Sequence, residues 1–195
     1  MHLDNTSCNL ASLNLMKFLK DDGQGHQSFE AERFQQVVEL VITAMDISIC
    51  FADFPTQKIG ENTRAFRQLG IGYANLGALL MATGHAYDSE GGRALAAAIT
   101  SLMTGTAYRR SAELAAVVGP YDGYARNADA NKRVMRQHAD ANGKAVRMDD
   151  LDTPVWAAAT EAWQDVVRLG DKNGFRNSQA SVLAPTGTIG LAMSC

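Results

Sequence analysis

The sequence predicts an α/β domain that is rich in helix and whose sheet is incomplete. Three observations lead to this fold class. Helical patterns occupy most of the chain, only a few short segments alternate polar and apolar residues, and no hairpin signal joins those segments. A chain of 195 residues suits one domain, and 46% apolar residues suffice for a hydrophobic core. We therefore expect residues 1–195 to be one domain or a large part of one.

Two segments are expected to be strands. Residues 6–15 alternate leucine with serine and asparagine, which places Leu13 and Leu15 on one side of an extended chain. Residues 178–184 alternate more loosely and predict a second, shorter strand.

The most apolar helix is expected over residues 29–54. Ser28 is its expected N-cap and Pro55 its stop, after a loop at residues 21–25. Residues 37–49 are apolar on most faces, so we expect this helix to be buried between other elements.

The rest of the chain is mainly helical. Residues 60–63 are expected to be a cap, and residues 64–82 a strand or helix around Gly70-Ile71-Gly72. Further helices are expected over residues 76–81, 90–118, 124–138 and 153–169. Asp88-Ser89 and Gly119-Pro120 mark the ends of the helix at residues 90–118. The helix at residues 153–169 is expected to follow an acidic turn at residues 149–152, to begin at Thr153-Pro154 and to stop at Gly170. Small residues in the alanine-rich helix, namely Ala94, Ala97, Ala98 and Gly105, allow close helix packing.

The bulk composition excludes several classes of protein. The net charge of −3 is mild, whereas proteins that coat nucleic acids or bind membrane surfaces are usually basic. No apolar run approaches the roughly 20 residues of a membrane span, and the N-terminus does not resemble a signal peptide. We therefore expect a cytoplasmic protein that binds neither DNA nor a membrane.

The cysteines and histidines do not predict a metal site. Cys8, Cys50 and Cys195 lack CxxC spacing, and reduced thiols are the expectation. Cys50 is expected to fill the core, whereas nothing in the sequence indicates a role for Cys195. Cys8 is either buried or redox-active, and residue type alone favours burial. The histidines, each expected at the surface without a partner at metal spacing, are His2, His26, His85 and His138.

The segment after the second expected strand is a candidate phosphate cradle. It consists of Pro185, Thr186, Gly187, Thr188 and Ile189. Glycine lets backbone N–H groups approach an anion, threonine hydroxyls donate further hydrogen bonds, and a helix beginning here adds a favourable dipole. No lysine is present, so this is not a Walker A loop, and an ordinary turn is the alternative.

The Gly70-Ile71-Gly72 segment is not a dinucleotide-binding fingerprint. Asn75 stands where the third glycine is required, and no acidic residue follows at the expected distance. These glycines instead predict close packing at a junction between a strand and a helix.

Three segments resemble the ribonucleotide reductase family. Residues 7–15 (SCNLASLNL) resemble the segment after that family's radical-cysteine loop. Residues 67–81 (RQLGIGYANLGALLM) resemble its LGxGxxN segment, and residues 177–189 resemble its phosphate-binding segment. The matches span essentially the whole chain in the family's order. The segments YANLGALLM and LAPTGTI resemble the corresponding segments of the adenosylcobalamin-dependent class.

The resemblance implies a fold and a chemistry. Residues 1–195 would be a piece, cut at both ends, of a ten-stranded α/β catalytic barrel that converts ribonucleotides to deoxyribonucleotides by thiyl-radical chemistry. Cys8 would be one of two redox-active cysteines, and residues 185–189 would hold the substrate phosphates. Adenosylcobalamin, an external dithiol such as thioredoxin, and a homodimer are also implied. The radical loop would precede Met1, so this piece alone is expected to be inactive.

Two alternatives remain open at this point. One is a self-contained helical module that binds a phosphate-bearing ligand through the same segment without catalysis. The other is the aerobic, iron-dependent class of the same enzyme.

Overall fold

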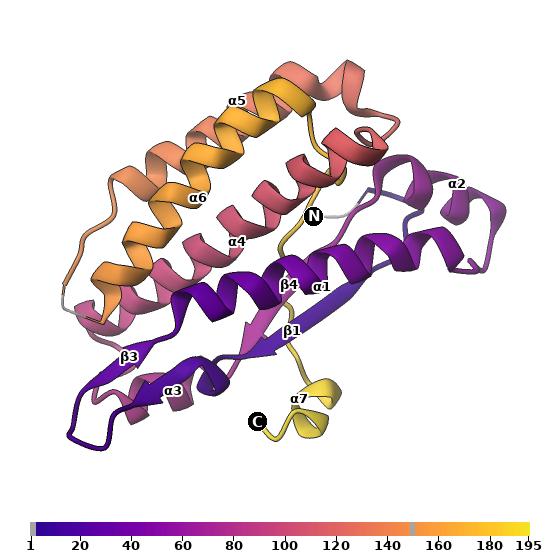
Figure 1. The fold of residues 1–195 in the computed structure, drawn as a ribbon. Coiled ribbons are helices and arrows are strands. Elements are labelled where there is room, and N and C mark those ends of the chain that lie inside the picture. The colour runs from indigo at the N-terminus through magenta and orange to yellow at the C-terminus, as the bar shows by residue number, and fades with distance from the viewer. Residues whose placement is uncertain (1–2, 149–150) are drawn as a thin grey trace.

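A computed structural model of the chain describes residues 3–148 and 151–195. His2 and two residues of the expected acidic turn, Asp149 and Asp150, lie outside these ranges. In chain order the elements are β1 (Leu10–Asn14), a 3-10 helix (Leu15–Phe18), β2 (Leu19–Asp21), β3 (Gln27–Phe29), α1 (Ala31–Phe51), α2 (Gln57–Phe66), β4 (Gly70–Ala74), α3 (Leu76–Ala82), α4 (Glu90–Val118), α5 (Tyr124–Gly143), α6 (Asp152–Asn173) and α7 (Thr188–Ala192). The long helices α1, α4, α5 and α6 stack beside the strands, and α7 lies apart near the C-terminus (Figure 1).

A small parallel sheet organises the domain. β1 and β4 pair in parallel from Leu10 opposite Gly70 to Asn14 opposite Ala74. On the other side of β4 the chain forms an isolated parallel bridge between Ile71 and Ser181. The strand expected over residues 178–184 is therefore reduced to one bridge, although the chain does run alongside β4 there. This order of parallel segments confirms the predicted α/β class.

A hairpin that the sequence did not predict precedes α1. β2 and β3 pair in antiparallel fashion, and the expected loop at residues 21–25 lies in the connection between them. Phe29 is extended in β3, with its ring 5.3 Å from that of Phe34 and 6.1 Å from that of Phe18. The predicted N-cap at Ser28 is wrong, because this aromatic packing holds the chain extended and delays α1 to Ala31.

Helix α1 is less buried than expected. Phe34, Val38 and Ile42 are fully buried, whereas Leu40 is 69% and Phe51 is 82% exposed. The expectation that no apolar run approaches a membrane span was also wrong, since α1 is long and apolar enough by length and composition. Its buried face belongs to the hydrophobic core, and core helices pass the same test.

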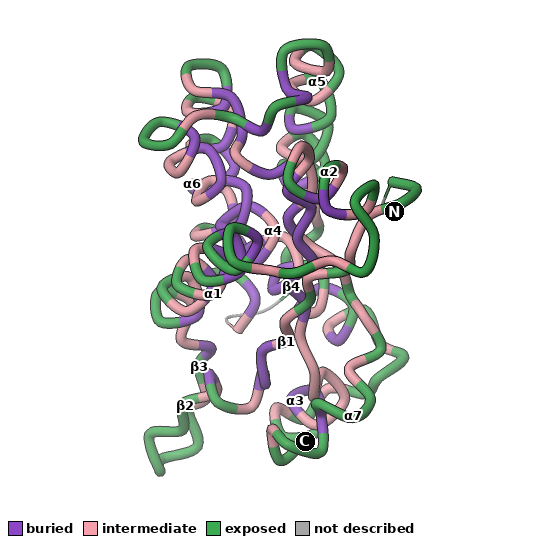
Figure 2. The backbone as a smooth tube through the Cα atoms, turned by 90° about the vertical axis from the view of Figure 1, so that its right-hand side faces the viewer, coloured by how far each residue is buried: buried purple, intermediate pink, exposed green. Residues whose placement is uncertain are grey.

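The core lies mainly where α4 packs on α6. The buried residues of α4 run from Gly92 to Ala115. Buried segments gather around α4 and α6 (Figure 2). An added Cβ at Gly105 would lie 3.2 Å from Trp163 Nε1 and 3.3 Å from Ala162 Cβ on α6. The predicted role of small residues in close packing is confirmed at this crossing.

Helix boundaries were predicted with mixed success. Ser89 caps α4, since its hydroxyl accepts from the Gly92 N–H at 3.0 Å. The expected cap at residues 60–63 is wrong, because these residues lie inside α2, which Thr56 caps. α6 begins at Asp152, before the predicted Thr153-Pro154 start, and runs past Gly170 to Asn173.

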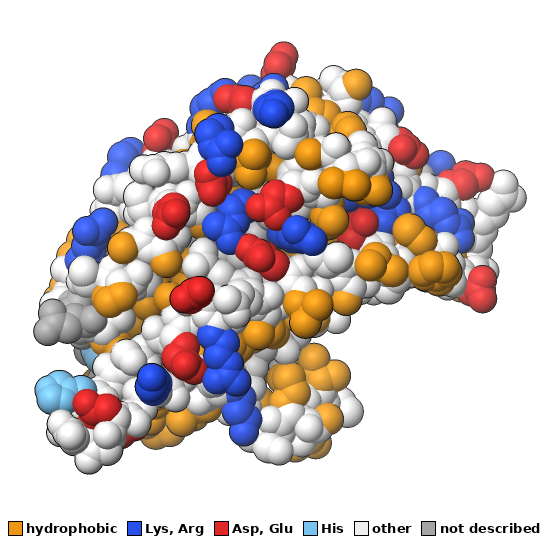
Figure 3. All heavy atoms as spheres, viewed as in Figure 1, with side chains coloured by type: hydrophobic (Ala, Val, Ile, Leu, Met, Phe, Trp, Pro, Cys, Tyr) orange, Lys and Arg blue, Asp and Glu red, His pale blue; other side chains and the backbone are white. Residues whose placement is uncertain are grey.

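Charged side chains of both signs are interspersed on the face formed by α1 and α4 (Figure 3). Arg109 of α4 pairs with Glu39 of α1, and Arg110 pairs with Glu113 at 3.0 Å. These pairs place opposite charges next to one another on this face.

Candidate functional site

The carboxyl ends of β1 and β4 meet the C-terminal segment of the chain. Because the two strands are parallel, Asn14 and Ala74 end them at the same edge. In open α/β sheets, ligands bind outside this edge. The segment at residues 182–187 passes the same strands and leads into α7 (Figure 1).

The 185–189 loop is tied to β1 through two hydroxyl groups. Ser12 Oγ and Thr186 Oγ1 lie 2.6 Å apart, and Thr186 Oγ1 also lies 3.2 Å from the carbonyl oxygen of Ala184. A threonine hydroxyl donates one proton and can also accept, so Thr186 can donate to the Ala184 carbonyl oxygen while it accepts from Ser12. Thr186 therefore anchors the loop to β1, whereas Gly187, Thr188 and Ile189 beside it are exposed.

Hydrogen bonds of the Asn14 side chain hold α7 and α3 at the same edge. Asn14 is 9% exposed, and its Oδ1 accepts from the Met16 N–H at 3.1 Å. The same oxygen accepts from Asn75 Nδ2 at 3.1 Å. Asn14 Nδ2 donates to the carbonyl oxygen of Met193 at 3.2 Å. One side chain thus joins β1, the start of α3 and the end of α7.

Backbone strain gathers at this edge. Asn75, Thr186 and Ser194 have positive φ angles of 68°, 52° and 58°. Such angles are uncommon for residues other than glycine, and most costly for a β-branched residue such as threonine. Strained residues of this kind cluster at functional sites.

Two glycines of β4 allow the C-terminal segment to approach. An added Cβ at Gly72 would lie 2.4 Å from the backbone oxygen of Val182, and one at Gly70 would lie 3.1 Å from the Val182 side chain. The prediction that these glycines serve close packing is confirmed. The neighbour is an extended segment beside the strand, and not a helix.

Cys8 lies beyond the other end of β1. It is a free, exposed thiol two residues before the strand begins. The residue-type preference for burial is therefore wrong here, because this part of the chain precedes the sheet and lies at the surface. Thiolate chemistry requires such access. The described structure does not bring Cys8 to the 185–189 loop, which contacts β1 further along at Ser12.

The other cysteines and histidines carry no metal site in the described ranges. Cys50 is exposed, so its predicted role in the core is wrong, and its sulfur lies 3.6 Å from Arg67 Nη2. Cys195 is exposed as well. Within residues 3–148 and 151–195, no three His, Cys, Asp or Glu residues are grouped to hold a metal ion.

Sequence reasoning missed a buried polar cluster that orients the C-terminal segment. Asp46 of α1 pairs with Arg67 at 2.8 Å, and both are nearly inaccessible. Asn177 Nδ2 donates to Asp46 Oδ1 at 2.8 Å and to the Arg67 carbonyl oxygen at 3.1 Å. Burial lowers the pKa of the Arg67 guanidinium, but the hydrogen bond and charge of Asp46 outweigh it and raise that pKa. An aspartate within the mostly apolar second half of α1 was the available signal.

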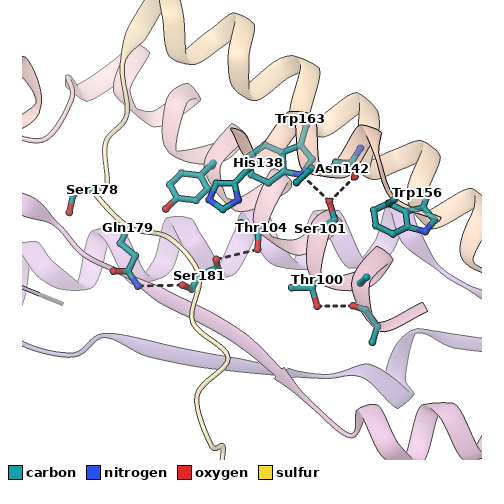
Figure 4. A pocket seen from close by; sticks show the side chains of 15 residues that line it. Thr100, Ser101, Thr104, His138, Asn142, Trp156, Trp163, Ser178, Gln179 and Ser181 are labelled. Atoms are coloured by element: carbon teal, nitrogen blue, oxygen red, sulfur yellow. Dashed lines mark hydrogen bonds between the residues drawn. The ribbon is translucent and has the colours of Figure 1, made fainter. Parts of the chain in front are cut away.

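A cavity of about 830 Å³ lies on the helix side of the sheet. It opens between α4, α5, α6 and residues 178–181 (Figure 4). Trp163 Nε1 donates to Ser101 Oγ at 3.0 Å, and that hydroxyl donates to Asn142 Oδ1 at 2.7 Å. His138 stacks on the Trp163 ring with centroids 5.5 Å apart. Neutral side chains line the cavity, and these bonds already satisfy several of them.

These features describe a helix-rich α/β unit built around short parallel segments. The whole chain, residues 1–195, matches the family described as ribonucleotide reductase, barrel domain. The chain therefore belongs to the ribonucleotide reductase family.

Similar proteins agree with this assignment. The chain is 89% identical over 195 residues to the vitamin B12-dependent ribonucleotide reductase of Streptomyces coelicolor, of which it covers 20%. It is 47% identical over 195 residues to the protein of the same description from Rhodopirellula baltica, of which it covers 18%. It is 28% identical over 179 residues (92% of the chain) to the ribonucleoside-diphosphate reductase large chain of Encephalitozoon cuniculi, of which it covers 21%. The chain thus spans about a fifth of the length of these relatives.

Proposed function

We propose that residues 1–195 contribute a substrate handle and one reducing thiol to a reductase that converts ribonucleotides to 2′-deoxyribonucleotides. The observation that carries this proposal is the 2.6 Å contact between Ser12 and Thr186. It ties the 185–189 loop to the edge of the parallel strands where ligands of α/β sheets bind. Membership of the reductase family supplies the reaction class.

The substrate handle is the 185–189 loop. The first N–H groups of a helix have no partner inside it, and α7 begins at Thr188. The Gly190 N–H already donates to the Gly187 carbonyl oxygen at 3.1 Å. The N–H groups of Thr188 and Ile189 and the Thr188 hydroxyl can donate to phosphate oxygens, while Thr186 holds the loop in place. Pro185, Gly187, Thr188 and Ile189 are exposed, so the loop is accessible. Fixing the phosphates orients the ribose for reaction, which is worth several kcal/mol when the geometry is right.

The reducing thiol is Cys8. Loss of the 2′-hydroxyl as water requires two electrons and two protons, which two thiols supply as they become a disulfide. We assign Cys8 as one of these thiols and place its partner, together with the cysteine that forms the thiyl radical, outside residues 1–195. An external dithiol such as thioredoxin then reduces the disulfide and restores Cys8.

The relatives described as vitamin B12-dependent favour adenosylcobalamin over the iron-dependent alternative. When bound, this cofactor generates the radical that the cysteine then carries. Its main binding elements belong to other parts of the complete protein, and we assign none of the residues of this chain to it. A cytoplasmic enzyme and a homodimer remain predictions.

One assay tests the proposal. A complete reductase containing this chain is expected to reduce ribonucleotides with adenosylcobalamin and an external dithiol, without a second subunit. Gly187→Val is expected to weaken substrate binding about tenfold, because an added side chain at Gly187 meets no protein atom within 4 Å and occupies the space before the loop.

Gly143→Val is the matched control, because its added side chain also enters open space, at the end of α5. Unchanged substrate affinity in Gly187→Val would remove the loop from the site. A strict requirement for a second, iron-containing subunit would overturn the class.

A further inference from the structure

We infer that Asn14 and Asn75 form a latch whose function is to position the substrate-phosphate loop. This inference rests on the proposed function of the 185–189 loop. Neither asparagine is proposed to touch the substrate. The latch consists of the Asn75–Asn14 hydrogen bond at 3.1 Å and the Asn14–Met193 hydrogen bond at 3.2 Å.

The geometry of Asn75 is costly for the local structure. Asparagine at an N-cap normally accepts a hydrogen bond from the first turn of its helix, which is worth about 1 kcal/mol. Asn75 is the N-cap of α3 but makes no such bond. Its φ of 68° adds backbone strain. Its side-chain amide donates to Asn14 instead, so the side chain does not cap α3.

Asn14 converts that contact into a fixed position for α7. Its oxygen accepts two hydrogen bonds, from Met16 and Asn75, which hold the amide plane in one orientation. The amide nitrogen then points at the carbonyl oxygen of Met193, which follows the last turn of α7. Ser12, two residues earlier on β1, holds Thr186 at the other end of α7.

Two tethers at the two ends of a five-residue helix fix both its position and its direction. If only the Ser12–Thr186 contact were present, α7 could rotate about Thr186. The first N–H groups of α7 would then occupy a range of positions. The loop is otherwise exposed and has few buried contacts. The latch therefore gives an exposed loop the fixed geometry that a positioned phosphate requires.

The test is substrate kinetics in the complete reductase with adenosylcobalamin and an external dithiol. Asn75→Gly removes the amide but keeps the positive φ without strain. Asn14→Ala removes both contacts. We expect the substrate KM to rise five- to twentyfold in each variant, with kcat within threefold of the parent protein. Asn75→Gly is expected to unfold at or near the parent temperature.

Asn142→Ala is the matched control. Asn142 of α5 is 8% exposed, and its side chain makes two hydrogen bonds, to Ser101 of α4 and Thr160 of α6. All three residues are far from the 185–189 loop in sequence. It should lower stability and leave KM unchanged, as a purely structural asparagine does.

The outcomes separate the latch from the loop. If Asn75→Gly and Asn14→Ala keep KM within twofold while Gly187→Val raises it, the latch is refuted and the loop stands. If none of the three changes KM, the proposed role of the loop fails as well. If Asn142→Ala raises KM as much as the latch variants, general destabilisation explains the effect and the latch is refuted.

Discussion

Ser12 and Thr186 are 174 positions apart in the sequence, yet their hydroxyl oxygens lie 2.6 Å apart. This contact joins β1 to the loop that precedes α7. It also places the 185–189 loop beside the carboxyl edge of β1 and β4, where the proposed substrate site lies.

Ser12→Ala should loosen this tether. Thr186 retains its bond to Ala184, so no buried proton is left without a partner, and we expect a loss of about 1 kcal/mol in the free energy of unfolding. The substrate KM should rise several-fold. Ser89→Ala removes a helix cap of comparable worth, about 1 kcal/mol, at a distant site and should leave KM unchanged. Equal KM values in the two variants would contradict a role for Ser12 in the site.

Gly72→Ala should displace the C-terminal segment. The added Cβ would lie 2.4 Å from the backbone oxygen of Val182, which cannot rotate away as a side chain can. Overpacking of this kind typically costs about 1–3 kcal/mol, measurable by denaturant unfolding. Gly77→Ala on α3 meets no atom within 4 Å and should be neutral or slightly stabilising. If both variants unfold alike, the segment does not approach β4 in solution.

Asp46→Ala should be the most destabilising of these substitutions. It leaves Arg67 buried without its partner, and breaking a buried ion pair costs about 3–5 kcal/mol. Asp165→Ala on α6 removes an ion pair with Arg168 whose arginine is largely exposed, and should cost about 0–1 kcal/mol. Chemical denaturation of the two variants measures the difference. A loss below about 1 kcal/mol for Asp46→Ala would mean that water replaces the pair.

Cys8→Ser should abolish steady-state turnover in the complete reductase. A serine hydroxyl cannot form the disulfide, so no electrons are available for repeated cycles. Cys50→Ser is the control, because Cys50 is equally exposed but lies on α1 beside Arg67. Product per enzyme, measured over many turnovers, distinguishes them. Normal turnover in Cys8→Ser would remove Cys8 from the redox pair.

Tyr108 should make the stability of the domain fall at high pH. Burial raises the pKa of its phenol to about 12 from an ordinary value of 10.0. Between these values the unfolded chain loses the proton while the folded chain keeps it, so stability is complete below pH 10 and declines as pH rises toward 12. Tyr108→Phe should show a shallower decline in denaturant unfolding over this range. Parallel curves for the two proteins would show that Tyr108 ionises freely.

The sequence by itself determined the features that depend on neighbouring residues. The α/β class, α4 with its Ser89 cap and Gly119 end, and the close approach at Gly70 and Gly72 all follow from local composition and spacing. The family resemblance also came from short segments. The glycine and threonine pattern by itself predicts the residues of the proposed loop.

Only the tertiary structure decided which of these segments meet. The β2–β3 hairpin depends on packing among Phe18, Phe29 and Phe34. No turn motif in the sequence predicts this hairpin. The exposed face of α1 also carries apolar residues such as Leu40 and Ile47, so hydrophobicity alone did not separate it from the buried face. Asn14, Asn75 and the Asp46–Arg67–Asn177 cluster act through hydrogen bonds between residues 21 to 179 positions apart. Such bonds form because the fold brings polar groups that are distant in sequence together away from water. A local sequence pattern does not identify the distant residue to which each group will bond.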